Sequence, residues 1–196
     1  MAELRGLELD VGIWPMPVEV ADPVRFTADN AGAYDPESAN RFSRILGQVD
    51  AILKEFRARF VGKCSPVHFF WGSFDLAVTR FSGRPAPPRP GADAVTREAY
   101  SHEVCSAGWW PGGGTLEGPA FYAYAAPEPE GLSRARIGPA EAFYSAEMKE
   151  FLYRYDDMRV AADPRAALLE FLQTTYEAAA NLAAWDRKAL ERGAPS

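Results

Sequence analysis

The stretch from Cys64 to Gly83 constrains the fold most strongly, because it is too apolar and aromatic for a loop and carries no helical repeat. From Val67 to Phe81 its side chains alternate between two faces, which is the pattern of a β-strand. One face is apolar at its middle, and we expect it to lie in the core: His68, Phe70, Gly72, Phe74, Leu76, Val78 and Arg80. The sequence therefore predicts a central strand that the rest of the chain covers.

The second face of this strand mixes large aromatic side chains with polar ones, in the order Phe69, Trp71, Ser73, Asp75, Ala77, Thr79 and Phe81. Aromatic walls with a few placed polar groups are typical of small-molecule sites, so this face is a candidate pocket floor. A half-exposed face with ordinary polar residues is the alternative interpretation.

Length and charge narrow the class of protein. A chain of 196 residues suits one domain, and we expect a single α+β domain over residues 1–196. A net charge of -6 without a basic patch argues against a nucleic-acid partner. No apolar run reaches the length of a membrane span and no signal peptide is apparent, so we expect no membrane association and a cytoplasmic location. Cys64 and Cys105 are expected to be reduced thiols.

Two segments have the apolar spacing of long amphipathic helices. The first opens at Asp35-Pro36, with Asp as N-cap and Pro at the first helical position, and runs to about Phe60. The second opens in the same way at Asp163-Pro164 and is expected to run to about Glu191. We expect the apolar stripe of each helix to pack on a sheet of its own domain.

Further strands are predicted on both sides of the central stretch. They cover Leu7 to Ile13, Val95 to Ala107, Ala120 to Ala126, and Phe151 to Tyr155, with a glycine-rich turn at residues 108–114. Strands grouped between two helices predict an α+β fold, with an antiparallel sheet of about four to five strands and the two long amphipathic helices packed on it.

The candidate catalytic residues are the two histidines of the chain, His68 and His102, with Asp75 or Glu103 as partner. Histidine carries protons readily near neutral pH, so such a pair would suit a hydrolase or an isomerase. Hydrogen-bonded structural histidines are the alternative. No metal-binding spacing such as HExxH or HxH is present, so we predict no metal ligands, and no cofactor is indicated.

The candidate ligand-binding residues are amphipathic side chains on the central strand and the following hairpin: Trp71, Ser73, Tyr100, Trp109, Trp110, Tyr122 and Tyr124. On adjacent strands under a glycine-rich turn, they would make a cavity for a small organic ligand. A tightly packed aromatic core with satisfied hydroxyl groups is the other possibility. Three functions therefore stay open, namely a small-molecule-binding domain, an enzyme, and a structural or protein-interaction subunit.

The chain resembles a bacterial family of unknown function, DUF5996, over essentially its whole length. The segments that carry the resemblance are HFFWGSFDLAVTRFSGR, KEFRARFVGKCSPV, SHEV, WWPGGG and FYAYAAPEP. The resemblance carries no activity, cofactor or catalytic residue. It implies that relatives have a further N-terminal region ahead of Leu7, so that this chain corresponds to their C-terminal part. A sheet without neighbouring strands would expose unpaired backbone groups, and we therefore expect a homodimer formed through the N-terminal strand or a helix face.

Overall fold

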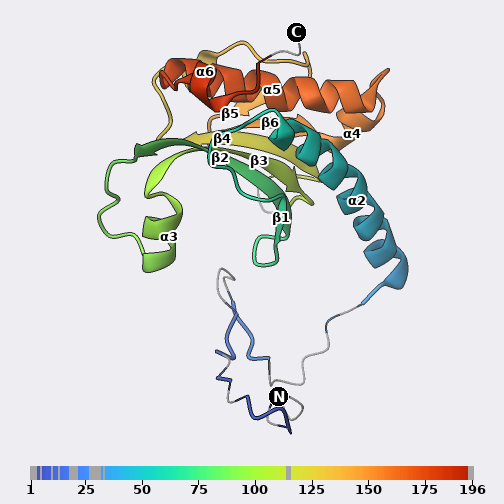
Figure 1. The fold of residues 1–196 in the computed structure, drawn as a ribbon. Helices are drawn as coiled ribbons and strands as arrows, with labels where there is room; N and C mark the ends of the chain where they lie inside the picture. Colours follow the sequence, from blue (N-terminus) through green and yellow to red (C-terminus); the bar gives the residue numbers. More distant parts are fainter. Residues whose placement is uncertain are drawn as a thin grey trace.

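The structure is a computed structural model, shown in Figure 1. It describes residues 34–113 and 116–193 without a break, together with residues 4, 6–9, 11–12, 14–17, 22–26 and 32.

A six-stranded antiparallel sheet forms the centre of the molecule, in the order β1-β2-β3-β4-β6-β5. The strands are β1 (His68–Phe70), β2 (Asp75–Pro85), β3 (His102–Trp110), β4 (Ala120–Ala126), β5 (Phe143–Ser145) and β6 (Glu150–Arg154). The α+β class and the antiparallel sheet are confirmed, with one strand more than the upper number expected.

Two long helices cover one face of the sheet, as predicted. These are α2 (Pro36–Ala58) and α5 (Pro164–Leu182), and Figure 1 shows them on the same side of the strands. Both N-caps are confirmed, because Asp35 accepts a hydrogen bond from the Glu37 amide and Asp163 accepts one from the Ala166 amide. Shorter helical segments complete the fold: α3 (Ala94–Ala99), η1 (Leu132–Arg134), α4 (Tyr155–Arg159) and α6 (Arg187–Leu190).

The hydrophobic core lies between these helices and the sheet. Leu53 of α2 and both Phe171 and Leu172 of α5 are fully buried there, and each such side chain stabilises the fold by about 1.5–3 kcal/mol. Arg80 also enters this core from β2, with its guanidinium carbon 3.5 Å from the centre of the Phe56 ring. Burial lowers the pKa of Arg80 to about 10, and the aromatic faces around it compensate part of the lost hydration.

The predicted central strand is wrong in one respect, because it is a hairpin. Residues 71–74 form a turn between β1 and β2, and Phe74 within it has a φ of 63°. The register places Phe70 opposite Asp75 and His68 opposite Ala77, so that these four side chains share one face. Leu76, Val78 and Arg80 do lie in the core, whereas His68 and Phe70 are on the other face and exposed.

The segment from Val95 to Ala107 is also not one strand. Its first part forms α3, because Asp93 caps a helix by accepting a hydrogen bond from the Thr96 amide at 3.0 Å. Likewise, the second long helix ends at Leu182 instead of Glu191. The chain turns there, with Ala184 at a φ of 50°, and then forms α6.

The described part of the predicted N-terminal strand is not in a strand conformation. Residues 7 and 8 lie in a turn, and the side chains of Leu7 and Leu9 are 70% and 50% exposed. Ile13 lies outside the described residues, as do Gly114 and Thr115 of the glycine-rich connection. The alternation of apolar residues was therefore not sufficient to predict a strand at positions 7–9 and 11–12, which are described and belong to no strand of the sheet.

Candidate functional site

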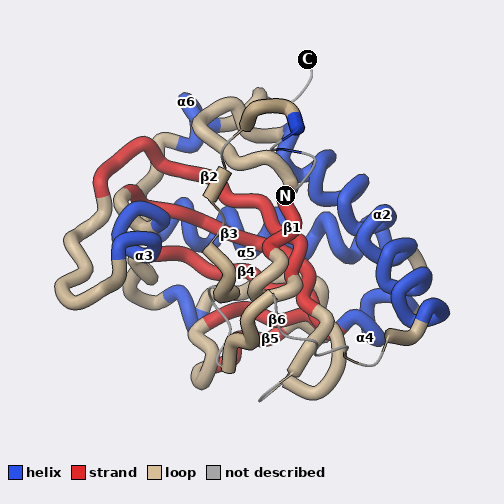
Figure 2. Tube along the Cα trace, turned by 90° about the horizontal axis from the view of Figure 1, so that it is seen from below, coloured by secondary structure: helices blue, strands red, loops and turns tan. Residues whose placement is uncertain are grey.

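A cavity of about 640 Å³ opens on the face of the sheet opposite α2 and α5. Figure 2 shows this face from below, with α5 behind the strands. Side chains of β2, β3, β4 and β6 line the cavity, together with residues of the β1–β2 turn, of the connection between β2 and β3, and of the segment after β4. The residues that define its chemistry are Asp75, Tyr100, Trp110, Tyr122, Tyr124 and Glu150.

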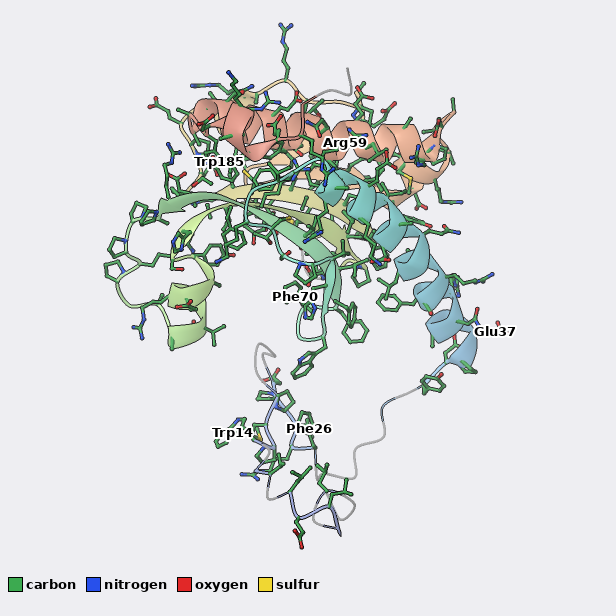
Figure 3. The ribbon with its side chains drawn as sticks, in the orientation of Figure 1. Trp14, Phe26, Glu37, Arg59, Phe70 and Trp185 are labelled. Carbon is green, nitrogen blue, oxygen red and sulfur yellow. The ribbon has the colours of Figure 1, made fainter. Side chains whose placement is uncertain are left out.

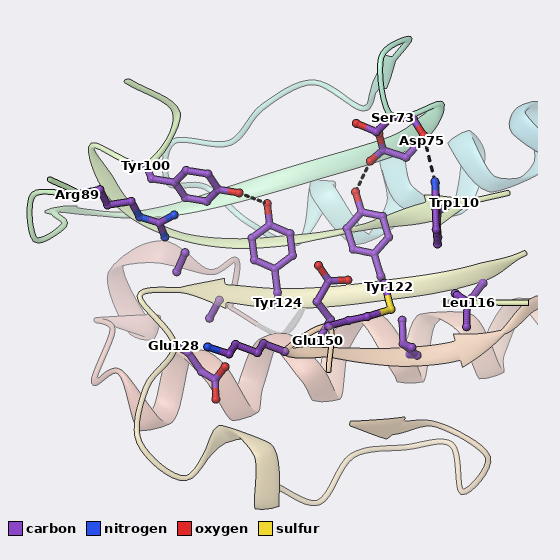
Figure 4. Close-up of a pocket in the computed structure, with 16 residues that line it drawn as sticks. Ser73, Asp75, Arg89, Tyr100, Trp110, Leu116, Tyr122, Tyr124, Glu128 and Glu150 are labelled. Carbon is purple, nitrogen blue, oxygen red and sulfur yellow. Dashed lines mark hydrogen bonds between the residues drawn. The ribbon is translucent and has the colours of Figure 1, made fainter. Parts of the chain in front are cut away.

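Asp75 begins β2 and is the most buried acidic group at the cavity, with 8% of its surface exposed. The hydroxyl of Tyr122, on β4, donates a hydrogen bond to Asp75 Oδ2 across the intervening strand (Figure 4). The second oxygen, Oδ1, is buried and receives no hydrogen bond from the described residues. Burial raises the pKa of the Asp75 carboxyl, and the hydrogen bond from Tyr122 opposes this change.

A glycine on the intervening strand makes this contact between β2 and β4 possible. A Cβ atom at Gly108 would lie 2.5 Å from the Leu76 carbonyl oxygen and 2.7 Å from the Tyr122 hydroxyl. Gly108 therefore leaves the space in which the Tyr122 side chain crosses β3 and reaches Asp75.

Glu150 is the second carboxylate of the cavity, at the start of β6. In Figure 4 it lies between the rings of Tyr122 and Tyr124. Burial, and after it the negative charge of Asp75, raise the pKa of Glu150 to about 7. This carboxyl group therefore changes its charge near neutral pH, which is the property of a group that binds or transfers protons.

Aromatic side chains form the wall between the two ends of the cavity. Tyr122 and Tyr124 are stacked, with ring centres 6.2 Å apart. The Tyr124 and Tyr100 hydroxyl oxygens are 3.0 Å apart, and the guanidinium carbon of Arg89 lies 4.0 Å from the centre of the Tyr100 ring. At the other end, Trp110 Nε1 donates to the Ser73 carbonyl oxygen at 3.1 Å, which fixes the β1–β2 turn at the rim.

The structure brings most of the predicted ligand-binding residues together. Ser73, Tyr100, Trp110, Tyr122 and Tyr124 all line the cavity, as does Asp75. Two others do not. Trp71 lies in the β1–β2 turn and is 50% exposed, and Trp109 points to the opposite face of the sheet, where it is buried in the core.

The predicted histidine sites do not converge. His68 pairs with Ala77, which pairs with Gly108, and His102 lies six residues before Gly108 on β3. At about 3.4 Å per residue the two histidines are separated by about 20 Å along the strand direction alone. Neither lines the cavity.

Each predicted catalytic residue outside the cavity has a local contact of its own. His68 is exposed and packs edge-on against Phe70, with ring centres 4.9 Å apart. The Nδ1 atom of His102 lies 3.1 Å from the Ser101 hydroxyl. Glu103 forms an ion pair with Arg84 at 2.7 Å, on the side of the sheet that carries the helices.

The sequence did not single out Glu150, Arg89, Lys149 or Met148, all of which line the cavity. Glu150 could have been found. The strand predicted at residues 151–155 begins one residue earlier in the structure, and the alternation of a strand places Glu150 on the same face as Leu152. Arg89 lies in a proline-rich connection that carries no periodic signal.

Two classes of feature are absent from the described residues. No group of three or more His, Cys, Asp and Glu side chains there is placed to hold a metal ion. None of the helices in that part of the chain is long and apolar enough to cross a membrane.

Comparison with known proteins gives a family and no activity. No curated protein and no solved structure matches the chain. A family model described as "Family of unknown function (DUF5996)" matches residues 1–192. This match agrees with the family resemblance that the sequence segments indicated. The chain therefore belongs to the DUF5996 family.

Proposed function

We propose that this protein binds a small organic molecule in the cavity between Asp75, Tyr124 and Glu150. The observation that carries the proposal is the cavity itself, since about 640 Å³ of space is bounded by aromatic walls and by a nine-tenths buried carboxylate, one oxygen of which receives no hydrogen bond from any described residue. Small-molecule sites usually have volumes of about 300–1,000 Å³ and combine apolar walls with a few polar groups.

The cost of the buried polar groups supports binding over simple packing. An unpaired oxygen on a buried carboxylate destabilises a fold by about 1–3 kcal/mol. A purely structural core would gain stability if an apolar residue replaced Asp75, because an apolar side chain carries no buried polar atom that needs a partner. A ligand that donates to Asp75 would remove this cost.

An acid/base enzyme is the second candidate function, and the Asp75–Tyr122 contact beside Glu150 favours it. Two carboxylates with different surroundings can serve as acid and base in one site. A histidine/carboxylate pair, expected from the sequence, stays a prediction without geometric support, since both histidines lie outside the cavity.

The expected homodimer also stays a proposal. The sequence led us to expect an interface through the N-terminal strand or a helix face. The exposed aromatic side chains favour a different surface, the β1 edge of the sheet with the adjoining turn, where Phe70, Trp71 and Phe74 are 43%, 50% and 52% exposed. Figure 3 shows Phe70 on the side of the sheet away from the helices. Light scattering after size-exclusion chromatography tests it, and a monomer for the wild type would exclude a stable dimer.

The binding proposal is tested with a set of fluorinated aromatic fragments that includes amines, alcohols and carboxylates, observed by fluorine NMR. Ser73 is exposed and lies at the cavity rim, so Ser73→Trp should obstruct the entrance and weaken binding. Ser43→Trp makes the same change at an exposed position of α2, far from the cavity in sequence and fold, and is the matched control. Fragments that bind both variants and the wild type equally would contradict the proposal.

A further inference from the structure

Asp75 and Glu150 reach the cavity from different strands, and neither forms an ion pair within the part of the chain that the structure describes. Asp75 comes from β2 and Glu150 from β6, with β3 and β4 between them in the sheet. Among the ion pairs of the described residues, none joins either carboxylate to a Lys or Arg side chain. Their negative charges therefore repel each other across the cavity without internal compensation.

The aromatic side chains between them add to the negative character of the site. The hydroxyls of Tyr122 and Tyr124 are directed to Asp75 and Tyr100, and both residues line the cavity with their rings stacked on each other (Figure 4). Aromatic ring faces attract organic cations, because the ring quadrupole is negative at the face. Acidic groups and ring faces thus surround the same space.

The cationic side chains of the site lie at its edge. Arg89 and Lys149 line the cavity and are both exposed, and Arg89 packs over Tyr100. Glu128, also exposed, is the third acidic group of the lining. The inner part of the cavity is therefore acidic and aromatic, with both signs of charge only near solvent.

We propose that the ligand carries a protonated amine, which the cavity holds between the carboxylates of Asp75 and Glu150 and against the rings of Tyr122 and Tyr124. This inference rests on the proposed function and specifies its ligand class. The ammonium group would donate to Asp75, whose buried Oδ1 atom receives no hydrogen bond from the described residues, and the negative charge of Glu150 in the same cavity would attract it further.

The experiment compares benzylamine, benzyl alcohol and benzoate, which share an aromatic ring and differ in charge. Binding is followed at pH 8 from the amide chemical shifts of the cavity residues in two-dimensional NMR spectra. Hydrogen bonds to charged groups correspond to roughly tenfold to hundredfold in affinity. We therefore expect benzylamine to bind at least about tenfold more tightly than benzyl alcohol, and benzoate to bind more weakly than either.

Two matched variants separate the site from bulk charge. Glu150→Gln should reduce benzylamine affinity by at least about tenfold, whereas Glu147→Gln, an exposed position in the adjoining β5–β6 turn, should leave it unchanged. Asp75→Asn provides a second loss of charge within the cavity. Amide spectra without ligand establish that each variant is folded.

The outcomes distinguish this inference from the proposed function. Equal binding of benzylamine and benzyl alcohol at the cavity, or preferred binding of benzoate, would overturn the amine class while leaving the binding proposal intact. A benzylamine affinity that survives both Glu150→Gln and Asp75→Asn would overturn it as well. If none of the three probes shifts the cavity residues while neutral fluorinated fragments bind there, the amine inference fails alone; if those fragments also fail to bind, both proposals fail.

Discussion

Replacing Glu150 by Gln should make the protein more stable, and the gain should depend on pH. The folded-state pKa of about 7, against an ordinary value of 4.5, corresponds to about 3 kcal/mol of unfavourable ionisation. Because the side chain is partly exposed, solvent screening reduces this to about 1–2 kcal/mol. Glu150→Gln removes the charge, so the free energy of unfolding at pH 8 should rise by about that amount.

The direction of the pH dependence follows from the raised pKa. Between pH 4.5 and pH 7 the folded protein binds more protons at Glu150 than the unfolded chain does. The stability of the wild type therefore falls as pH rises through this window, and the penalty is complete above it. At pH 5 most of the penalty is absent, so the gain from Glu150→Gln should be below about 0.5 kcal/mol.

Urea unfolding followed by tryptophan fluorescence measures these differences, since Trp109 and Trp185 are buried in the core. The exposed Glu147→Gln variant is the control for a change of net charge, and its effect should be similar at pH 5 and pH 8. If Glu150→Gln raised the free energy of unfolding equally at both pH values, or lowered it at pH 8, the predicted cost of ionising Glu150 would be wrong.

Three further predictions use the same unfolding assay. Tyr122→Phe leaves Asp75 buried without its hydrogen-bond donor, and should cost about 1.5–3 kcal/mol at pH 8; an unchanged stability would contradict the importance of this contact. Gly108→Ala places a Cβ atom against the Leu76 carbonyl and the Tyr122 hydroxyl, and should destabilise the protein by about 1–3 kcal/mol. Gly47→Ala, at an exposed position of α2 where a Cβ atom has open space, should not destabilise it. Asp163→Ala removes the cap of α5 and should cost about 1 kcal/mol, and a neutral result would show that other contacts fix the helix start.

The helices were predictable because their signals are local. Asp35 and Asp163, each followed by Pro, fix both helix starts through a hydrogen bond between residues a few positions apart. The end of α5 was not predictable in the same way, since the alanine-rich sequence favours helix beyond Leu182 and the chain turns only where Trp185 enters the core.

The hairpin in the central stretch was missed because its turn contains no proline and only one glycine. Phe74 holds the positive φ there, a conformation that sequence rules assign to glycine or asparagine. The insertion of a turn moved Phe70 and His68 to the opposite face from the one expected, while Asp75 and the residues after it kept the predicted alternation.

The candidate site was predictable to the extent that it follows strand alternation. Asp75, Tyr122 and Tyr124 were identified because they lie on regular parts of β2 and β4. Trp109 was misplaced because two adjacent tryptophans must point to opposite faces, and the sequence does not show which one meets the core. The presence of Glu150 and Asp75 in one cavity depends on the order of strands in the sheet, which no local pattern determines.

The most direct test of the account is the titration of the Glu150 side-chain carboxyl carbon by NMR, in the free protein and with benzylamine. We predict a midpoint near 7 in the free protein, and a lower midpoint when a protonated amine lies beside the carboxylate. A midpoint near 4.5 that benzylamine does not change would mean that Glu150 is an ordinary solvated side chain, and would contradict the account.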